Sequence, residues 1–92
     1  MRSRYTAHVL RNEAYLLATW HPSTRPTHAA PDPATKWLGL DVHDHQIVDG
    51  LHAEVEFVAR YRVQGRGGRM HERSRFVRED DERWYYVDGA TR

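Results

Sequence analysis

With 92 residues, the chain is long enough for one small domain with a single core, and we expect that domain to cover residues 1–92. Its 14 Lys+Arg and 13 Asp+Glu leave a formal charge of +1, so the net charge favours no particular partner. The absence of cysteine excludes disulfides, thiolate zinc sites and a cysteine nucleophile. Since no apolar run approaches membrane-spanning length and the N-terminus lacks a signal peptide's apolar core, we expect a cytoplasmic protein that does not enter a membrane.

Two short helices are predicted in the N-terminal third. Ser3 is a suitable N-cap for a helix that ends near Leu10, and Asn12 is a suitable cap for a second helix over residues 13–19. Pro22 ends the second helix and begins a rigid, proline-rich connecting loop. The side chains that helical spacing directs at a core are Tyr5, Val9, Leu16, Leu17 and Trp20.

The rest of the chain predicts four antiparallel strands, covering residues 37–47, 51–64, 69–78 and 83–88. Asp49-Gly50 is a strong hairpin signal between the first two strands. The other connections are a glycine-rich loop over residues 65–68 and an acidic turn centred on Asp80-Asp81. Two helices packed in a curved four-stranded meander make an α+β domain.

These turns predict a strand register that collects the aliphatic side chains on one face of the sheet. The expected pairs on that face are Val42–Phe57, Leu40–Ala59, Leu38–Tyr61, Val63–Met70, Tyr61–Glu72, Ala59–Ser74, Phe57–Phe76, Phe76–Tyr85 and Ser74–Val87. On the outer face, the same register places His45 beside Glu54, His43 beside Glu56, Arg73 beside Asp88, and Arg60 beside Arg73.

Six stretches spread over almost the whole chain carry distinctive residue combinations: Met1–Tyr5, Tyr15–Thr24, Trp37–Leu40, Phe57–Arg60, Glu72–Phe76 and Trp84–Gly89. Together they resemble the middle domain of the YchJ-like bacterial family. The resemblance implies a nuclear-transport-factor-2-like (NTF2-like), or cystatin-like, cone in which a curved sheet wraps around helices. That superfamily contains isomerases, hydrolases, dehydratases and catalytically silent binding domains, so the fold implies no single function.

Many members of the YchJ-like family carry Cys-rich zinc-binding motifs, of the SEC-C type, on both sides of this domain. The chain has no cysteine and therefore lacks these motifs. We carry over no zinc-dependent role from the resemblance.

Glu72 is the first candidate for chemistry. The register places its carboxyl group on the apolar face, opposite Tyr61, where a charge is costly unless it is paired. It could act as a general acid or base in the cone, or it could be a structural carboxylate bonded to Tyr61, to the backbone or to an arginine. We favour the structural role, because buried ion pairs also perturb pKa values.

His21 is the second candidate, at the end of the second predicted helix. Histidine titrates near neutrality, and His21 at the mouth of the cone could form an acid–base pair with Glu72. Alternatively, Trp20 fills the core while His21 and Ser23 tie the loop to the backbone, which we favour for a His-Pro dipeptide. The expected lining of the cavity is Trp20, Ser23, Arg25, Tyr61, Ser74 and Phe76.

Three histidines are expected on the outer face: His43, His45 and His71. A metal centre would need a third ligand that converges with two of them. Glu54 and Glu56 could supply it, but they more simply pair with the histidines. We therefore expect no metal and no cofactor.

The outer face also combines arginines with an apolar strip, which is typical of protein–protein surfaces. We expect a homodimer through Val58, Arg60, Arg73, Arg75, Val77, Trp84 and Tyr86. Arginines beside exposed aromatics could also bind an anion or nucleic acid, but only Trp84 and Tyr86 would provide stacking, so we do not expect nucleic acid.

The leading hypothesis for function is a small-ligand-binding or protein-interaction module on a cone-shaped scaffold, with a small apolar ligand. The alternative is a small acid–base enzyme, of isomerase, hydrolase or dehydratase type, that uses Glu72 and His21. The size of the cavity discriminates between them, because Leu16, Trp20, Phe57 and Phe76 could fill the cone completely.

Overall fold

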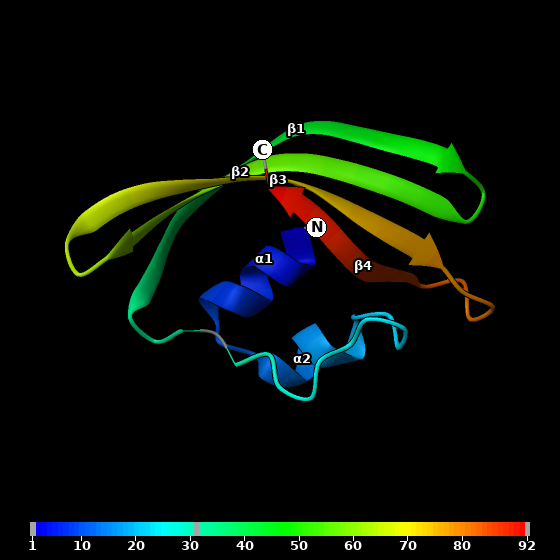
Figure 1. Ribbon diagram of the computed structural model, residues 1–92, viewed down its shortest axis with the longest axis horizontal. Coiled ribbons are helices and arrows are strands. Elements are labelled where there is room, and N and C mark those ends of the chain that lie inside the picture. Colours follow the sequence, from blue (N-terminus) through cyan, green and yellow to red (C-terminus); the bar gives the residue numbers. More distant parts are fainter. Residues whose placement is uncertain (1, 31, 92) are drawn as a thin grey trace.

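The computed structural model describes residues 2–30 and 32–91 as two helices followed by one four-stranded sheet. The elements are α1 (Arg2–Val9), α2 (Glu13–Ala18), β1 (Thr35–Asp49), β2 (His52–Val63), β3 (Arg66–Arg78) and β4 (Trp84–Thr91). The sheet is an antiparallel meander in the order β1-β2-β3-β4. It curves over both helices, which lie together on its concave side (Figure 1). The predicted α+β class is confirmed, and no helix among the described residues is long and apolar enough to cross a membrane.

Ser3 lies inside α1 and is therefore not the N-cap that the sequence predicted, whereas the predicted cap of α2 is confirmed. Asn12 caps α2, because its side-chain oxygen accepts a hydrogen bond of 3.1 Å from the backbone N–H of Tyr15.

Helix α1 differs from the prediction in the face that it buries. Arg4 and Ala7 are buried, three residues apart, whereas Val9 is 46% exposed. A charged residue therefore occupies the inward face of α1.

The core lies between the helices and the middle of the sheet. Phe57 and Leu16 are each only 1% exposed. Phe57 lies on the concave face of β2, and Leu16 lies on α2, which this face covers. The sheet part of the core is Val55, Phe57, Ala59 and Phe76. Burying a large apolar side chain contributes about 1.5–3 kcal/mol, so this cluster is the main source of stability.

Strand β1 contains three irregularities that the sequence did not predict. The predicted pairs Val42–Phe57 and Leu40–Ala59 are confirmed. A shift between Trp37 and Gly39 then places Trp37, not Leu38, opposite Tyr61. Trp37 packs edge-on against Tyr61 at 5.8 Å between ring centroids, and Leu38 is left 45% exposed. The predicted pair Leu38–Tyr61 is therefore wrong.

The second irregularity in β1 leaves His43 as an extra residue between Val42 and Asp44. An inserted residue reverses the side-chain alternation that follows it. His45 consequently lies opposite Val55 on the concave side instead of the outer side. The predicted register pairs His43–Glu56 and His45–Glu54 are wrong, since the observed pairs are Asp44–Glu56 and Gln46–Glu54. The side chain of His43 nevertheless lies beside Glu56 on the outer face, as predicted.

The turn between β2 and β3 is tighter than predicted. It consists of Gln64 and Gly65, with φ of 51° and 79°, and Val63 pairs directly with Arg66. Positive φ at both central residues is the geometry of a type I′ hairpin turn, which suits the twist of the flanking strands. The glycines at 67 and 68 belong to β3 and not to a four-residue loop.

This tighter turn moves β3 by four residues along β2 without exchanging its faces. All four predicted β2–β3 pairs are wrong, and the observed pairs are Phe57–Glu72, Ala59–Met70, Val55–Ser74 and Ala53–Phe76. On the outer face, Arg73 lies opposite Glu56, and Arg60 lies opposite Arg69. The predicted contact between Arg60 and Arg73 is therefore wrong.

Strand β4 carries a further irregularity beside Arg75 and Phe76 of β3. Phe76 pairs with Tyr86 and Ser74 pairs with Gly89, so their predicted partners, Tyr85 and Val87, are wrong. Asp88 pairs with Arg75 and not with Arg73, its predicted partner. The turn before β4 is one residue longer than predicted, since Arg78 pairs with Trp84, and this turns Tyr86 toward the helices, where its ring lies 5.9 Å from that of Phe76. An aromatic residue expected on the outside is thus part of the interior.

The type I′ turn can be tested by comparing two neighbouring glycines. Gly65→Ala forces a Cβ into the left-handed region and should lower the free energy of unfolding by about 1–2 kcal/mol. Gly67→Ala is the matched control, because its Cβ would come no closer than 4.0 Å to the Tyr61 carbonyl oxygen. Urea unfolding of both variants measures the difference. Equal effects at the two positions would contradict the observed turn.

Candidate functional site

A cavity of about 250 Å³ lies between the helices and one end of the sheet. Its lining comprises Ser3, Arg4, Tyr15, Thr19, His45, Ile47, Ala53, Val55, Phe76 and Trp84. Phe57 and Leu16 fill the middle of the concave face, so the cone is partly filled and open space remains toward the ends of the strands. Pockets for drug-sized ligands are about 300–1,000 Å³, so this cavity suits a smaller molecule.

Arg4 is the charged group of this cavity, and it is only 6% exposed. Its Nη1 donates to the Leu16 carbonyl oxygen at 3.1 Å and to Thr19 Oγ1 at 2.6 Å. These acceptors lie at the C-terminal end of α2, where carbonyl groups lack helical partners and the helix dipole favours a cation. Arg4 therefore joins the two helices.

Two aromatic rings also contact the Arg4 guanidinium. Its Cζ lies 4.5 Å from the ring centroid of Tyr86 and 5.3 Å from that of Trp20. Cation–π contacts contribute about 0.5–2 kcal/mol, more where water is excluded. Burial lowers the pKa of Arg4, while Tyr86, Tyr15 and Glu72 oppose that shift. Burial also raises the pKa of Tyr86 to about 12, and the nearby Glu72 carboxylate adds to the rise.

Glu72 lies on β3 opposite Phe57, and it is partly buried. Its Oε2 accepts a hydrogen bond of 2.7 Å from the hydroxyl of Ser74, a residue with 0% exposure. The side chain crosses directly over Gly89, where a Cβ would collide with it. Glu72 thus has a structural partner, and the described lining of the cavity does not include it.

His21 has different neighbours from Glu72. Its ring bonds to Ser23 Oγ at 2.7 Å through Nδ1 and to the carboxylate of Glu79 through Nε2. Its backbone N–H donates to the Tyr86 carbonyl oxygen at 2.7 Å. These bonds hold His21 against the start of β4 and the turn before it. The structure does not bring His21 and Glu72 together as an acid–base pair.

The remaining predicted cavity residues are distributed over several places. Of these residues, Phe76 lines the cavity. Trp20 is not part of the lining, but it contacts the lining residue Arg4. Its Nε1 donates to Thr24 Oγ1 at 3.1 Å. Arg25 folds back onto the Trp20 carbonyl oxygen at 3.0 Å. Ser74 is enclosed beside Glu72, and Tyr61 packs on Trp37.

The predicted dimer surface is divided between the two faces. Trp84 lines the concave cavity, and Tyr86 points to the same side and contacts Arg4. Arg60, Arg73 and Arg75 lie on the outer, convex face. The convex face carries ion pairs: Arg60–Asp41 at 2.7 Å, Arg75–Asp88 at 2.5 Å, and Arg73 with Glu54, Asp44 and Glu56 at 2.5, 3.1 and 3.4 Å. The homodimer stays a prediction.

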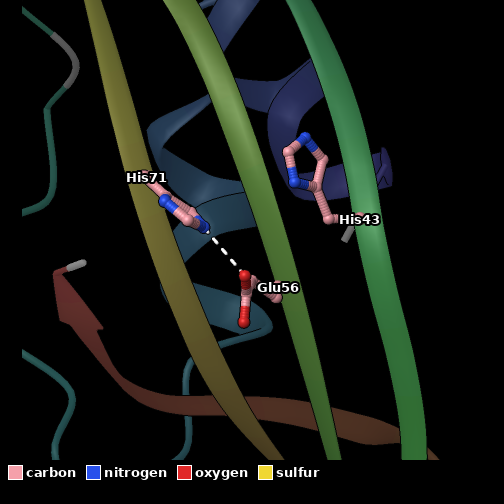
Figure 2. A group of neighbouring side chains, drawn as sticks. All are labelled: His43, Glu56 and His71. Carbon is pink, nitrogen blue, oxygen red and sulfur yellow. Dashed lines mark hydrogen bonds and ion pairs between the residues drawn. The ribbon is translucent and has the colours of Figure 1, made fainter.

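One group on the convex face has the composition of a metal-ligand set. His43, Glu56 and His71 come from β1, β2 and β3 and converge on one point (Figure 2). One ligand atom from each lies within 4.8 Å of the other two. His71 Nε2 is 2.9 Å from Glu56 Oε2, and the two imidazole rings are 5.7 Å apart.

Sequence reasoning missed Arg4, His45 and Trp84 as cavity residues. The three-residue spacing of Arg4 and Ala7 was a signal that an arginine could lie on the inward face of α1. His45 and Trp84 had no comparable signal, because the inserted residue in β1 and the length of the turn before β4 decide their faces.

A curved antiparallel sheet with its helices on the concave side defines the chain as an NTF2-like α+β domain. The family model described as "YchJ, middle NTF2-like domain" matches residues 1–89. The chain therefore belongs to this family, as the resemblance implied.

Several relatives are named UPF0225 protein. One from Polaromonas naphthalenivorans (strain CJ2) is 65% identical over 97% of this chain and 65% of its own length. One from Cupriavidus pinatubonensis is 58% identical over 97% of this chain and 66% of its own length. One from Bordetella pertussis is 58% identical over 100% of this chain and 69% of its own length. The chain thus spans about two-thirds of the length of these relatives. No solved structure matches it.

The burial of Tyr86 predicts a pH dependence of stability. An unfolded tyrosine ionises near pH 10, whereas folded Tyr86 stays protonated to about pH 12. The folded state therefore holds more protons in this interval, and its stability should fall as pH rises from 10 to 12, by at most about 1.4 kcal/mol per pH unit. Tyr86→Phe should remove this part of the fall. Urea unfolding at a series of pH values tests it, with neutral pH as the reference, and an unchanged slope in Tyr86→Phe would contradict it.

Proposed function

We propose that this domain binds a small molecule with an apolar body and an anionic group, such as a carboxylate, in the concave cavity. The observation that supports this proposal is a buried guanidinium, Arg4, in the wall of an otherwise largely apolar cavity. Ligand sites commonly combine apolar walls with a few convergent polar groups. The fold contributes only the scaffold to this argument.

The guanidinium of Arg4 retains donors for a ligand. A guanidinium carries five N–H donors, and both bonds that Arg4 makes to described residues leave from Nη1. Nε and Nη2 form the planar fork that binds carboxylates with two parallel hydrogen bonds. A carboxylate in this position would also compensate the charge that burial disfavours.

The remaining lining fits the apolar part of such a ligand. Ala53, Val55 and Phe76 supply the sheet wall, and Trp84 supplies a flat aromatic surface. Ile47 and Trp84 are 57% and 37% exposed, so they border an open side through which a ligand can enter. Ser3, Tyr15, Thr19 and His45 add polar groups to the lining.

The acid–base enzyme does not gain comparable support. Its two candidate groups, Glu72 and His21, are held by Ser74 and by Glu79 with Ser23, respectively. A general base must be within hydrogen-bond reach of the proton that it removes from the substrate. We therefore propose binding, not catalysis, as the function of the cavity.

The proposal predicts a charge-selective interaction with 2-naphthoate, a small aromatic carboxylate. In NMR titrations, 2-naphthoate should shift the amide signals of cavity residues, and 2-naphthylmethanol, its neutral counterpart, should bind more weakly. Arg4→Gln keeps a polar side chain but removes the guanidinium and its charge, so it should weaken 2-naphthoate about tenfold or more and leave the alcohol unchanged.

Two further variants separate binding from folding. Ala53→Leu fills the cavity without changing its charge and should weaken both probes. Arg11→Gln is the matched control, because Arg11 is exposed and bonds to the Pro33 carbonyl outside the cavity. Circular dichroism checks that each variant is folded. The absence of cavity shifts at millimolar 2-naphthoate would overturn the proposal.

A further inference from the structure

We propose that the convex face of the sheet carries a binding site for a divalent transition-metal ion, with Zn²⁺ as its best-suited occupant, formed by His43, Glu56 and His71. This site is independent of the concave cavity. Two imidazoles and one carboxylate are donors that Zn²⁺ accepts, and three protein ligands leave a fourth position for water. The chemistry of the donors also disfavours Mg²⁺ and Ca²⁺, which prefer oxygen ligands only.

The distances allow the three side chains to close around an ion. Zinc–ligand bonds of about 2.0–2.1 Å place tetrahedral ligand atoms about 3.3 Å apart. His71 Nε2 and Glu56 Oε2 are already 2.9 Å apart, and the set spans at most 4.8 Å. His43 is exposed, and its ring is turned toward His71 from the next strand but one, so a change of side-chain rotamer completes the set (Figure 2).

The backbone holds these ligands in place before any ion binds. His71 pairs with Val58 and Glu56 pairs with Arg73 in the regular β2–β3 ladder, which fixes the offset between the two ligands. His43 is the inserted residue of β1, next to Asp44, which pairs with Glu56. Inserted residues of this kind re-aim a side chain, and this one directs His43 to the same point.

The charges around the site favour a cation. Arg73 is a positive group in contact with the set, and its Nη1 lies 3.4 Å from Glu56 Oε1, the oxygen that does not face His71. Arg73 also binds Glu54 at 2.5 Å and Asp44 at 3.1 Å. These two carboxylates offset its charge. A guanidinium held in this way orients Glu56 as an outer-shell partner of the ion.

The site is tested by calorimetric titration of the full 92-residue chain with Zn²⁺, and by the visible spectrum with Co²⁺, which reports tetrahedral coordination. We expect one ion per chain. His43→Ala, His71→Ala and Glu56→Gln should each weaken Zn²⁺ binding about tenfold or more, since each removes one ligand. Glu56→Gln retains hydrogen-bonding capacity toward His71 and Arg73, which separates loss of the ligand from loss of the fold.

His52→Ala is the matched control. His52 Nδ1 lies 2.8 Å from Asp49 Oδ1, so it also forms an exposed histidine–carboxylate pair on this sheet, outside the three-residue set. Its replacement should leave Zn²⁺ affinity unchanged. The proposal is overturned if no Zn²⁺ binds, if the three ligand variants bind like the unchanged chain, or if His52→Ala weakens binding as much as they do.

Discussion

The buried guanidinium of Arg4 is the contact on which the arrangement of helices and sheet depends. It bonds to the end of α2 through the Leu16 carbonyl and Thr19, and it stacks on Tyr86 of β4. Helix α2 has only six residues and would not be stable alone in water. A buried charge is costly unless its donors are satisfied, so the two helices and β4 must meet at this point together.

The segment after α2 reinforces the same junction from the backbone. Tyr86 donates its N–H to the Thr19 carbonyl oxygen at 2.8 Å, and its own carbonyl accepts from His21 at 2.7 Å. Thr24 Oγ1 adds a bond of 2.6 Å to the Val87 carbonyl oxygen. The Trp-His-Pro stretch, which looked reactive in the sequence, thus connects the end of a helix to the edge strand of the sheet.

The irregular strand β1 gives the two faces of the sheet different chemistry. One inserted residue sends His43 to the convex face and His45 to the concave face, although only Asp44 separates them. The concave side then combines apolar walls with Arg4, and the convex side combines imidazoles with ion pairs. The two proposed sites occupy opposite faces of one sheet.

The sequence by itself determined the helices, the number of strands, the meander order and the family, because caps, turn residues and alternating apolar positions are local signals. It also identified Phe57 and Leu16 as core residues. Only the tertiary structure decided the partners of Glu72, the inward position of Arg4 and the faces of His45 and Tyr86. Loop length and bulges set the strand positions among these, and one inserted residue reverses every following side chain at little local cost. The choice of register, like the inward face of α1, therefore rests with the packing of the whole sheet on its helices.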